Sequence, residues 1–266
     1  MVLSIVIPAY NEEGSIIETI ETLYATLVKY GIPNEIVVVN DNSKDNTLGI
    51  LQALQQSVPS LVVYTNPGPN GFGMAVRYGL ERFTGDCVAV MMADLSDAPE
   101  DLVKFYYKLN EGYDCVFGSR FSKGGKVIDY PKIKLMINRV ANMIIKLCFG
   151  FRYNDTTNAF KMYRRSTLEG LKPFLAPHFN LTVELPLKAI VRGYSYAVLP
   201  NSWTNRKHGV SKLKIREMGS RYFFILLYCL IEKYFSRGDY RKKEIRVDEK
   251  NKVGEPMAHR TSSVKV

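Results

Sequence analysis

The sequence predicts an α/β protein with a mainly parallel sheet, and two observations lead to that prediction. Short apolar runs alternate along the chain with longer segments in which apolar residues recur at helical spacing. The apolar runs are nearly continuous, whereas a sheet with one face in water would alternate polar and apolar residues, so helices are expected on both faces. With 266 residues, of which 46% are hydrophobic, the chain can form one large domain or two small ones.

The predicted elements alternate in type along the N-terminal part of the chain. Strands are expected at residues 4–8, 35–40, 61–64 and 87–92. Helices are expected between them, at residues 12–30, 47–57 and 71–83. This βαβαβαβ order is typical of a parallel sheet, in which ligands bind beyond the carboxyl ends of the strands. The segments that follow the strands are therefore the expected place of a site.

Polar, acid-rich segments follow three of these strands. They read PAYNEEGS, VNDNSKDNT and MADLSDAPED, and each brings Asp, Glu or Asn directly after an apolar run. Such residues also cap helices and form turns; Asp97, with Glu100 three residues later, fits an ordinary helix N-cap. Three acidic segments at one edge of one sheet nevertheless suit a nucleotide whose diphosphate is bridged by Mg²⁺ or Mn²⁺.

The ordered set of motifs resembles glycosyltransferase family 2. It begins with IVIPAYNEEGSI, VVVNDNSKDNT and MADLSDAPEDL, continues with FGSRF, NRVAN and DTTNAFKMYRR, and ends with RKHGVSKL, covering about residues 3–213. Within that family the chain is similar to the dolichyl- and polyprenyl-phosphate sugar synthases, the dolichol-phosphate mannosyltransferase-like group. The resemblance implies the GT-A fold, a Rossmann-like, mainly parallel sheet flanked by helices, with residues 1–215 as the catalytic domain.

The resemblance also implies the residues of a nucleotide and metal site. Asp94 corresponds to the metal-binding acid of the family's DxD motif, and Ser96 beside it is expected as a second metal ligand. Asp41 would hold the base or the ribose. The other nucleotide-binding residues implied by the resemblance are Pro8, Ala9, Tyr10, Glu12 and Ala93.

The chain departs from the family pattern at three positions of this site. Met92 stands where the first Asp of the motif is usual, Ser96 where such synthases often have Gln, and Asn40 where another Asp is common. The loss of a carboxylate should weaken metal binding. Asp94 is left as the chief protein ligand, with Ser96 or Asp97 as helpers.

Basic residues in the later motifs correspond to phosphate contacts in the group that the chain resembles. In that group, the phosphate of a polyprenol attacks C1 of a nucleotide sugar in one inverting displacement, and Arg pairs well with phosphate oxygens. The implied catalytic residues are Asp94, Arg120, Arg206 and Lys212. The implied contacts of the acceptor phosphate are Arg120, Arg139 and Asn142. The donor stays open between GDP-mannose and a UDP-hexose.

Two alternatives concern the acceptor and catalysis itself. An anionic phosphate needs no strong general base, whereas a saccharide hydroxyl does. The chain lacks the QxxRW motif of many hydroxyl-accepting relatives, which favours the phosphate; Glu184 is the base expected if the acceptor is a hydroxyl. The other alternative is a family member that binds nucleotide sugar or lipid without turnover, and Met92 in place of the motif's first acid favours it.

Residues 132–149, KIKLMINRVANMIIKLCF, form a predicted amphipathic helix. At helical spacing, Lys132, Arg139 and Lys146 fall on one stripe with Asn142 beside them, and Ile and Val side chains fall opposite. Such a basic amphipathic helix can lie in the headgroup region of a membrane. The alternative is that the Ile and Val face packs on the sheet.

A second segment, residues 216–235, is expected to be an apolar helix at the membrane interface. Its core, YFFILLYCLI, is about half of the roughly 20 apolar residues that span a bilayer, so insertion into one leaflet or docking on a partner's transmembrane helices is expected. Residues 236–266 are polar and charged and predict a basic, disordered tail. The protein is therefore expected at the cytoplasmic face of a membrane, as a peripheral or monotopic protein.

The net charge of +10 and the pI of about 9.3 indicate a polyanionic partner without choosing among phosphorylated substrates, anionic lipid and nucleic acid. Nucleic acid is not expected, because the tyrosines lie mainly in apolar runs or motif loops rather than among Lys and Arg on a sheet face. The run GFGMAVRYG lacks the GxGxxG spacing of a dinucleotide fingerprint, which argues against a dehydrogenase.

Overall fold

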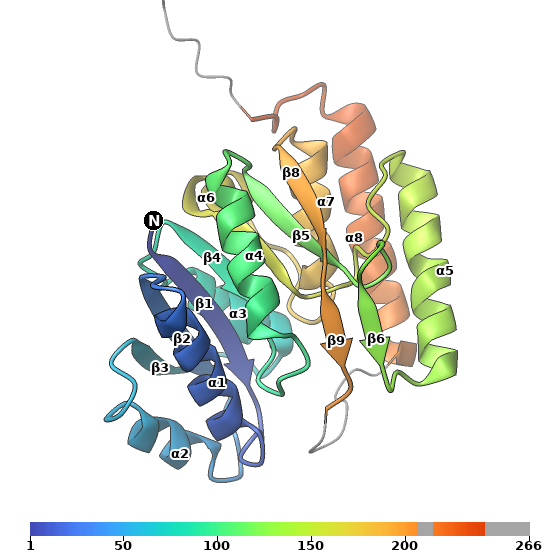
Figure 1. The fold of residues 1–266 in the computed structure, drawn as a ribbon. Helices are drawn as coiled ribbons and strands as arrows, with labels where there is room; N and C mark the ends of the chain where they lie inside the picture. Colours follow the sequence, from blue (N-terminus) through green and yellow to red (C-terminus); the bar gives the residue numbers. More distant parts are fainter. Residues whose placement is uncertain (207–214, 243–266) are drawn as a thin grey trace, which may run out of the picture.

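The computed structural model describes residues 1–206 and 215–242, and its centre is a seven-stranded sheet (Figure 1). The strand order is β3-β2-β1-β4-β7-β5-β8. Neighbouring strands are parallel except at β7, which runs antiparallel to both β4 and β5. The strands are β1 (Leu3–Ala9), β2 (Asn34–Asn40), β3 (Leu61–Thr65), β4 (Cys87–Val90), β5 (Cys115–Ser119), β7 (Lys161–Arg164) and β8 (Tyr196–Pro200). The predicted α/β class with a mainly parallel sheet is confirmed.

The N-terminal half follows the predicted alternation of strands and helices. Its helices are α1 (Ile16–Lys29), α2 (Thr47–Leu54) and α3 (Phe72–Leu80). The helices α2 and α3 end three residues before their predicted ends. Two further differences lie at the carboxyl edge of the sheet. The strand β4 stops at Val90, because its register with β1 ends at the pair Val6–Val90. The helix α1 begins after the acidic segment at residues 11–15, which is thereby left as a loop beyond the end of β1.

Helices cover both faces of the sheet, as the nearly continuous apolar strands predicted. Along β1, Ile5 and Ile7 belong to one core cluster and Val6 to the other, since successive side chains point to opposite faces. The first cluster is closed by α1, α2 and α4 (Pro99–Asn110). The second is closed by α3, α6 (Arg165–Leu171) and α7 (Leu181–Val191), with side chains from the two long helices α5 and α8.

A small two-stranded sheet lies beside the large one. Its parallel strands are β6 (Lys126–Ile128) and β9 (Ser202–Thr204). An isolated bridge joins Asp97 to Trp203, and the Thr204 N–H donates to the Ser96 carbonyl at 2.9 Å. The segment after β8 is therefore held against the residues that follow β4.

The helix α5 (Lys132–Phe149) has the predicted bounds, but its apolar face lies outward. The buried residues of α5 are Asn142, Ile145 and Phe149. The alternative that the Ile and Val face packs on the sheet is therefore wrong. The exposed large apolar residues of this helix are Ile133, Met136, Ile137, Val140, Met143, Ile144 and Leu147.

The helix α8 (Ile215–Phe235) packs on α7 and lies beside α5 (Figure 1). It buries Ile225 and Cys229, and Lys233 donates to the Phe149 carbonyl at the end of α5 at 2.6 Å. Its exposed large apolar residues are Phe223, Phe224, Leu227, Ile231, Tyr234 and Phe235. Within residues 1–206 and 215–242, none of the helices is long and apolar enough to cross a membrane. Residues 243–266 of the predicted tail lie outside the described residues.

Candidate active site

The acidic segments after β1, β2 and β4 each contain one non-glycine residue with left-handed backbone geometry. These residues are Asn11 (φ 52°), Asn42 (φ 60°) and Leu95 (φ 53°). Asn adopts this conformation more readily than most residues, whereas a bulky Leu rarely does. Each turn redirects the chain as it leaves the sheet, and the turn at Leu95 lies between the two predicted metal ligands, Asp94 and Ser96.

The first two segments are fastened to each other. The Asn11 N–H donates to Ser43 Oγ at 3.0 Å, and the Lys44 N–H donates to Asn11 Oδ1 at 2.7 Å. The Glu12 N–H donates to Thr47 Oγ1 at 2.9 Å. These bonds fix the backbone around Glu12, a residue that is 8% exposed.

The predicted nucleotide residues fall into two groups by exposure. Pro8, Ala9 and Ala93 are buried, the first two within β1, so they shape the edge of the sheet. The carbonyl of Ala93 accepts hydrogen bonds from the Ser15 and Thr19 hydroxyls at 2.9 and 3.0 Å. Because Ser15 and Thr19 lie at the start of α1, these bonds fix the chain next to Asp94. Tyr10, by contrast, is partly exposed at the end of β1.

Asp41 is buried and bound to neighbouring loops. Its Oδ1 accepts from Asn66 Nδ2 at 2.7 Å and its Oδ2 from the Gly71 N–H at 2.8 Å. These bonds hold the start of α3 against the end of β2. Each oxygen keeps a second lone pair, and the role of Asp41 in holding the base or ribose stays a prediction.

Asp94 lies in an ion pair with Arg206. Arg206 NH2 is 2.6 Å from Asp94 Oδ2, and Arg206 NH1 is 3.4 Å from Glu12 Oε1. The other carboxylate oxygen of Asp94 accepts from the Ser96 N–H at 3.1 Å. Asp94 is 9% exposed. Arg206 is the second residue after the end of β9. The structure thus brings together three predicted residues that are far apart in sequence.

The oxygen atoms around Asp94 fit a divalent cation that shares its coordination with substrate. Ser96 Oγ and Asp97 Oδ1 are buried and have no hydrogen-bond partner among the described residues. Mg²⁺ usually keeps several waters and is held by one or two carboxylates together with substrate phosphates. In the described part of the chain, no group of three or more His, Cys, Asp or Glu side chains is arranged to hold a metal. Asp94, Ser96 and Asp97 are the residues here whose side-chain oxygens could hold such a cation.

Asp97 is a buried acid rather than the helix cap that its spacing suggested. The N-cap of α4 is Ala98, followed by Pro99, and no side chain makes a capping hydrogen bond. Burial, reinforced by the nearby charge of Asp94, raises the pKa of Asp97 to about 8. Asp97 is therefore largely protonated near neutral pH.

Arg120 and Asp155 form a buried, forked ion pair. Arg120 Nε and NH2 donate to the two carboxylate oxygens at 2.8 and 2.7 Å, and the Arg120 N–H donates to Asp155 Oδ2 at 2.9 Å. Burial alone would lower the pKa of Arg120, but the charge and hydrogen bonds of Asp155 outweigh it and raise the pKa above its ordinary value. The fork predicted to contact phosphate is thus engaged within the protein.

Arg139 and Asn142 lie one turn apart on α5 but in different surroundings. Arg139 is exposed, and its guanidinium lies 4.6 Å from the Phe121 ring centroid, while that of Arg120 lies 5.3 Å from it. Asn142 is buried: its Nδ2 donates to Thr157 Oγ1 at 2.9 Å, and its Oδ1 accepts from the Thr157 N–H at 3.2 Å. The structure thus brings both arginines to one ring, whereas Asn142 ties α5 to the loop that carries Asp155.

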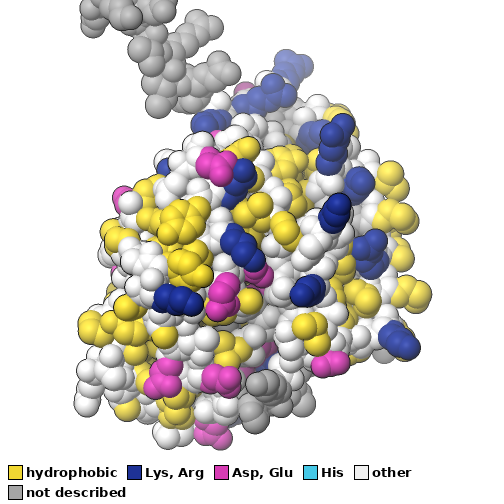
Figure 2. All heavy atoms as spheres, viewed as in Figure 1, with side chains coloured by type: hydrophobic (Ala, Val, Ile, Leu, Met, Phe, Trp, Pro, Cys, Tyr) yellow, Lys and Arg dark blue, Asp and Glu magenta, His cyan; other side chains and the backbone are white. Residues whose placement is uncertain are grey.

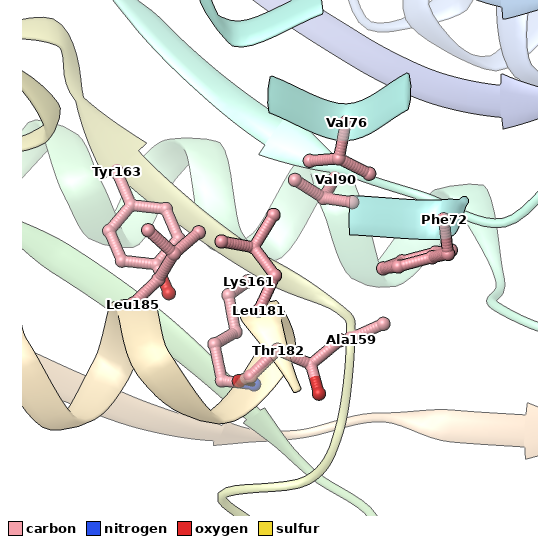
Figure 3. A pocket seen from close by; sticks show the side chains of 9 residues that line it. All are labelled: Phe72, Val76, Val90, Ala159, Lys161, Tyr163, Leu181, Thr182 and Leu185. Carbon is pink, nitrogen blue, oxygen red and sulfur yellow. Dashed lines mark hydrogen bonds between the residues drawn. The ribbon is translucent and has the colours of Figure 1, made fainter. Parts of the chain in front are cut away.

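A small cavity of about 10 Å³ lies on the α3 and α7 side of the sheet, which is room for about one water (Figure 3). Lys161 from β7 lines it and donates to the carbonyls of Thr156, Asn158 and Thr182. Burial lowers the pKa of Lys161 to about 7, although Asp155 opposes the shift. The sequence interpretation missed Lys161. Its signal was a lysine inside the apolar segment of DTTNAFKMYRR.

The alternative general base, Glu184, is enclosed by its own helix and the preceding loop. It is fully buried, and its oxygens accept from the Leu175 and Ala176 N–H groups at 2.8 and 2.7 Å and from Lys188 Nζ at 2.5 Å. A base in these surroundings cannot reach a substrate hydroxyl, which corrects that expectation. Lys212, the remaining predicted catalytic residue, lies outside the described residues.

The mainly parallel sheet flanked by helices is the fold of the GT-A class. A family model described as "Glycosyl transferase family 2" matches residues 4–171. The chain belongs to this family. The predictions of the family, of its fold and of a glycosyltransferase are confirmed.

Two curated relatives are similar over most of the chain. The chain is 33% identical over 220 residues to a dolichol-phosphate mannosyltransferase of Pyrococcus furiosus, a match that covers 80% of this chain and 60% of the relative. It is 32% identical over 218 residues to a polyprenol monophosphomannose synthase of Mycolicibacterium smegmatis, which covers 79% of this chain and 80% of the relative. The chain thus spans less than two thirds of the first relative's length.

Among solved structures, glucosyl-3-phosphoglycerate synthase from Mycobacterium tuberculosis has the same fold. Its complex with Mn²⁺, UDP-glucose and phosphoglyceric acid superposes with a TM-score of 0.65 at 19% identity, over 86% of this chain and 79% of that one. Its complex with Mg²⁺ and UDP gives 0.61 at 20% identity, over 87% and 79%. At this identity the likeness establishes the fold alone.

Proposed function

We propose that the protein transfers a hexose, mannose or glucose in preference, from a GDP- or UDP-sugar to polyprenyl or dolichyl phosphate at a membrane surface. The observation that carries this proposal is the position of Asp94: it lies in the segment after β4, at the carboxyl edge of a family 2 sheet, and pairs with Arg206, which also contacts Glu12. The printed names of the two curated relatives, a dolichol-phosphate mannosyltransferase and a polyprenol monophosphomannose synthase, support the acceptor and favour mannose.

The proposed reaction is a single displacement at the sugar. An oxygen of the acceptor phosphate forms a bond to C1 while the bond from C1 to the donor diphosphate breaks, and the electron pair of that bond leaves with the nucleoside diphosphate. The acceptor phosphate is already anionic near neutral pH, so no side chain has to remove a proton. This agrees with the enclosed position of Glu184.

The chain's own residues would position the two phosphates. Asp94 and Ser96 would hold Mg²⁺ or Mn²⁺, which when bound offsets the negative charge of the departing diphosphate. Arg206 lies close enough to Asp94 to meet the same diphosphate. Arg139, exposed beside Phe121, would contact the acceptor phosphate. Arg120 would act next to it in an orientation fixed by Asp155.

The membrane part of the proposal rests on α5 and α8. The large apolar side chains of α5 project outward, and the helix carries four basic residues and no acidic one, at Lys132, Lys134, Arg139 and Lys146. Figure 2 shows apolar side chains along α5 at the right edge of the molecule, with basic side chains gathered between α5 and α4. An apolar stripe flanked by Lys and Arg suits a leaflet with anionic headgroups. Peripheral binding at the cytoplasmic face is the arrangement we infer. The exposed phenylalanines of α8 would enter the same leaflet or contact a partner's transmembrane helix.

The alternative of a family member without catalytic turnover has one specific observation in its favour. Met92 provides no carboxylate at the first position of the acidic motif, as a nucleotide-sugar or lipid-binding protein without turnover would allow.

The proposed transfer is tested with labelled nucleotide sugars, including GDP-mannose, UDP-glucose and UDP-N-acetylhexosamine, and vesicles that contain polyprenyl phosphate. The label that passes into the organic phase is measured. Vesicles with unphosphorylated polyprenol are the matched control.

We expect one donor to label the phosphate-containing vesicles and none to label the polyprenol control. The label should be lost on mild acid treatment, because a sugar linked through C1 to a phosphate is acid-labile. Binding of nucleotide sugar without transfer under all of these conditions would favour the alternative.

A further inference from the structure

We propose that Arg206 occupies the cation position at Asp94 in the absence of donor, so that a divalent metal binds well only together with a nucleoside diphosphate. The inference rests on the proposed function, because it concerns the same site. It adds an order of binding and assigns Arg206 a competing role in addition to phosphate contact.

Both carboxylate oxygens of Asp94 are already engaged in the structure. Oδ1 accepts from the Ser96 N–H at 3.1 Å, and Oδ2 lies 2.6 Å from Arg206 NH2. The second arm of the guanidinium, NH1, lies 3.4 Å from Glu12 Oε1. A metal ion that approaches Oδ2 must displace Arg206 from a short, charge-assisted contact.

The position of Arg206 is set by the backbone rather than by the ion pair alone. The Thr204 N–H donates to the Ser96 carbonyl at 2.9 Å, and the Asn205 N–H donates to the Ile128 carbonyl at 3.0 Å. The side chain of Arg206 is 14% exposed and that of Asp94 is 6% exposed, so solvent screens their attraction little. The backbone before Arg206 is thus bonded to the segment after β4 and to β6, and the guanidinium reaches Asp94 from it.

The charges of the site explain why a diphosphate would change the balance. Arg206 contacts the carboxylates of Asp94 and Glu12, and Met92 adds no negative charge at the first position of the acidic motif. Without nucleotide, a metal and the guanidinium compete for the same oxygen. A nucleoside diphosphate supplies oxygens that suit both cations, since guanidinium groups pair with phosphate in forked hydrogen bonds and Mg²⁺ or Mn²⁺ bridges diphosphates.

The test measures Mn²⁺ binding to the protein by electron paramagnetic resonance of the unbound ion, with and without GDP or UDP. The variants are Arg206→Gln and Arg206→Ala, which remove the charge, and Arg206→Lys, which keeps it. Lys104→Gln is the matched control, because it removes the charge of another basic residue that pairs with an aspartate. Lys104 pairs with Asp101, and the Lys104 side chain is 63% exposed. Thermal unfolding of each variant shows beforehand that it is folded.

We expect Arg206→Gln and Arg206→Ala to bind Mn²⁺ alone about tenfold more tightly than wild type. Arg206→Lys should stay close to wild type, and Lys104→Gln should equal it. Added nucleoside diphosphate should tighten Mn²⁺ binding to wild type. The difference in Mn²⁺ affinity between wild type and the uncharged variants should then become smaller. Equal or weaker Mn²⁺ affinity in the uncharged variants, or no Mn²⁺ binding by any of these proteins, would overturn the inference.

The two proposals fail separately. Tighter Mn²⁺ binding by Arg206→Gln, combined with no sugar transfer from any donor, would retain the competition and reject the transferase. Sugar transfer by wild type, combined with unchanged Mn²⁺ affinity in the variants, would do the reverse.

Discussion

Asp155 holds Arg120 through both ends of its guanidinium fork, at 2.8 and 2.7 Å, and accepts the Arg120 backbone N–H as well. The two side chains come from different segments: Arg120 follows β5 and Asp155 lies in the loop before β7. Both are buried. The pair therefore joins two loops at the proposed acceptor side of the site.

We expect Asp155→Asn to destabilise the protein by about 3–5 kcal/mol, because it leaves the Arg120 charge buried without its partner. Chemical denaturation measures the change. Glu169→Gln is the control, since Glu169 pairs with Lys172 at a surface where its side chain is 56% exposed, and it should cost less than about 1 kcal/mol. Equal effects of the two substitutions would show that the buried pair has no special structural role.

Asn142 is expected to act by positioning the loop after Phe151 rather than by direct phosphate contact alone. Asn142→Ala removes the bonds to Thr157 and should lower stability by about 1–3 kcal/mol. It should also raise KM for the lipid acceptor while KM for the donor stays unchanged. Asn110→Ala, at the exposed end of α4, is the control and should do neither. An Asn142→Ala protein of unchanged stability would contradict the positioning role.

The membrane proposal gives an expectation for the outward face of α5. Ile133 and Leu147 are each 72% exposed. The double variant Ile133→Glu, Leu147→Glu should bind vesicles at least about tenfold more weakly than wild type, because charged groups replace two aliphatic side chains that would be buried in the bilayer. Its thermal stability should not fall. Sedimentation with vesicles that contain phosphatidylglycerol measures the binding.

The matched control places two glutamates on α1. Ile17 and Val28 are 44% and 56% exposed, so Ile17→Glu, Val28→Glu makes the same change in charge on another face. This control should bind vesicles as wild type does. Equal binding by both double variants would show that α5 is not the membrane contact.

Lys161 gives an expectation for pH. Its pKa is lowered by burial to about 7, so between pH 7 and its ordinary value of 10.5 the unfolded chain binds more protons at this residue than the folded one. The stability contributed by Lys161 is therefore fully present above the ordinary pKa and is lost as pH falls through about 7. Asp97, with a pKa of about 8, titrates in the opposite sense at lower pH, so the range above it isolates the lysine.

We expect the unfolding free energy of wild type, relative to Lys161→Met, to rise with pH by up to about 1.4 kcal/mol per unit between about pH 8.5 and 10. Denaturation of both proteins at matched ionic strength measures the difference, and other titrating groups cancel in it. Parallel pH profiles would mean that Lys161 is charged in the folded protein throughout this range.

The sequence predicted the parts of the site that depend on local pattern. Apolar runs that end in acids located the segments that follow β1, β2 and β4. The parallel sheet brings these segments to one edge. Residue contacts across long sequence separations were not predictable in this way. The pairing of Arg206 with Asp94 depends on how β9 lies against the segment after β4, and no periodicity records that arrangement.

The two faces of α5 illustrate the same limit. Helical spacing separated its basic stripe from its aliphatic one, but it does not say which part of the helix faces the protein. In the structure that part is the line of Asn142, Ile145 and Phe149, between the two predicted stripes. Likewise, Glu184 looked available as a base because its burial and its bonds to the preceding loop arise only from tertiary packing.

The central claim is that Asp94 supports transfer of the sugar, and one pair of variants tests it directly. Asp94→Asn keeps the shape of the side chain at the carboxyl end of β4, and Asp86→Asn makes the same change just before the amino end of that strand. Transfer of labelled hexose to polyprenyl phosphate, measured in both folded variants, should fall by about 100-fold or more in Asp94→Asn and stay within about twofold of wild type in Asp86→Asn. An Asp94→Asn protein that transfers sugar at a rate close to that of Asp86→Asn would contradict the claim.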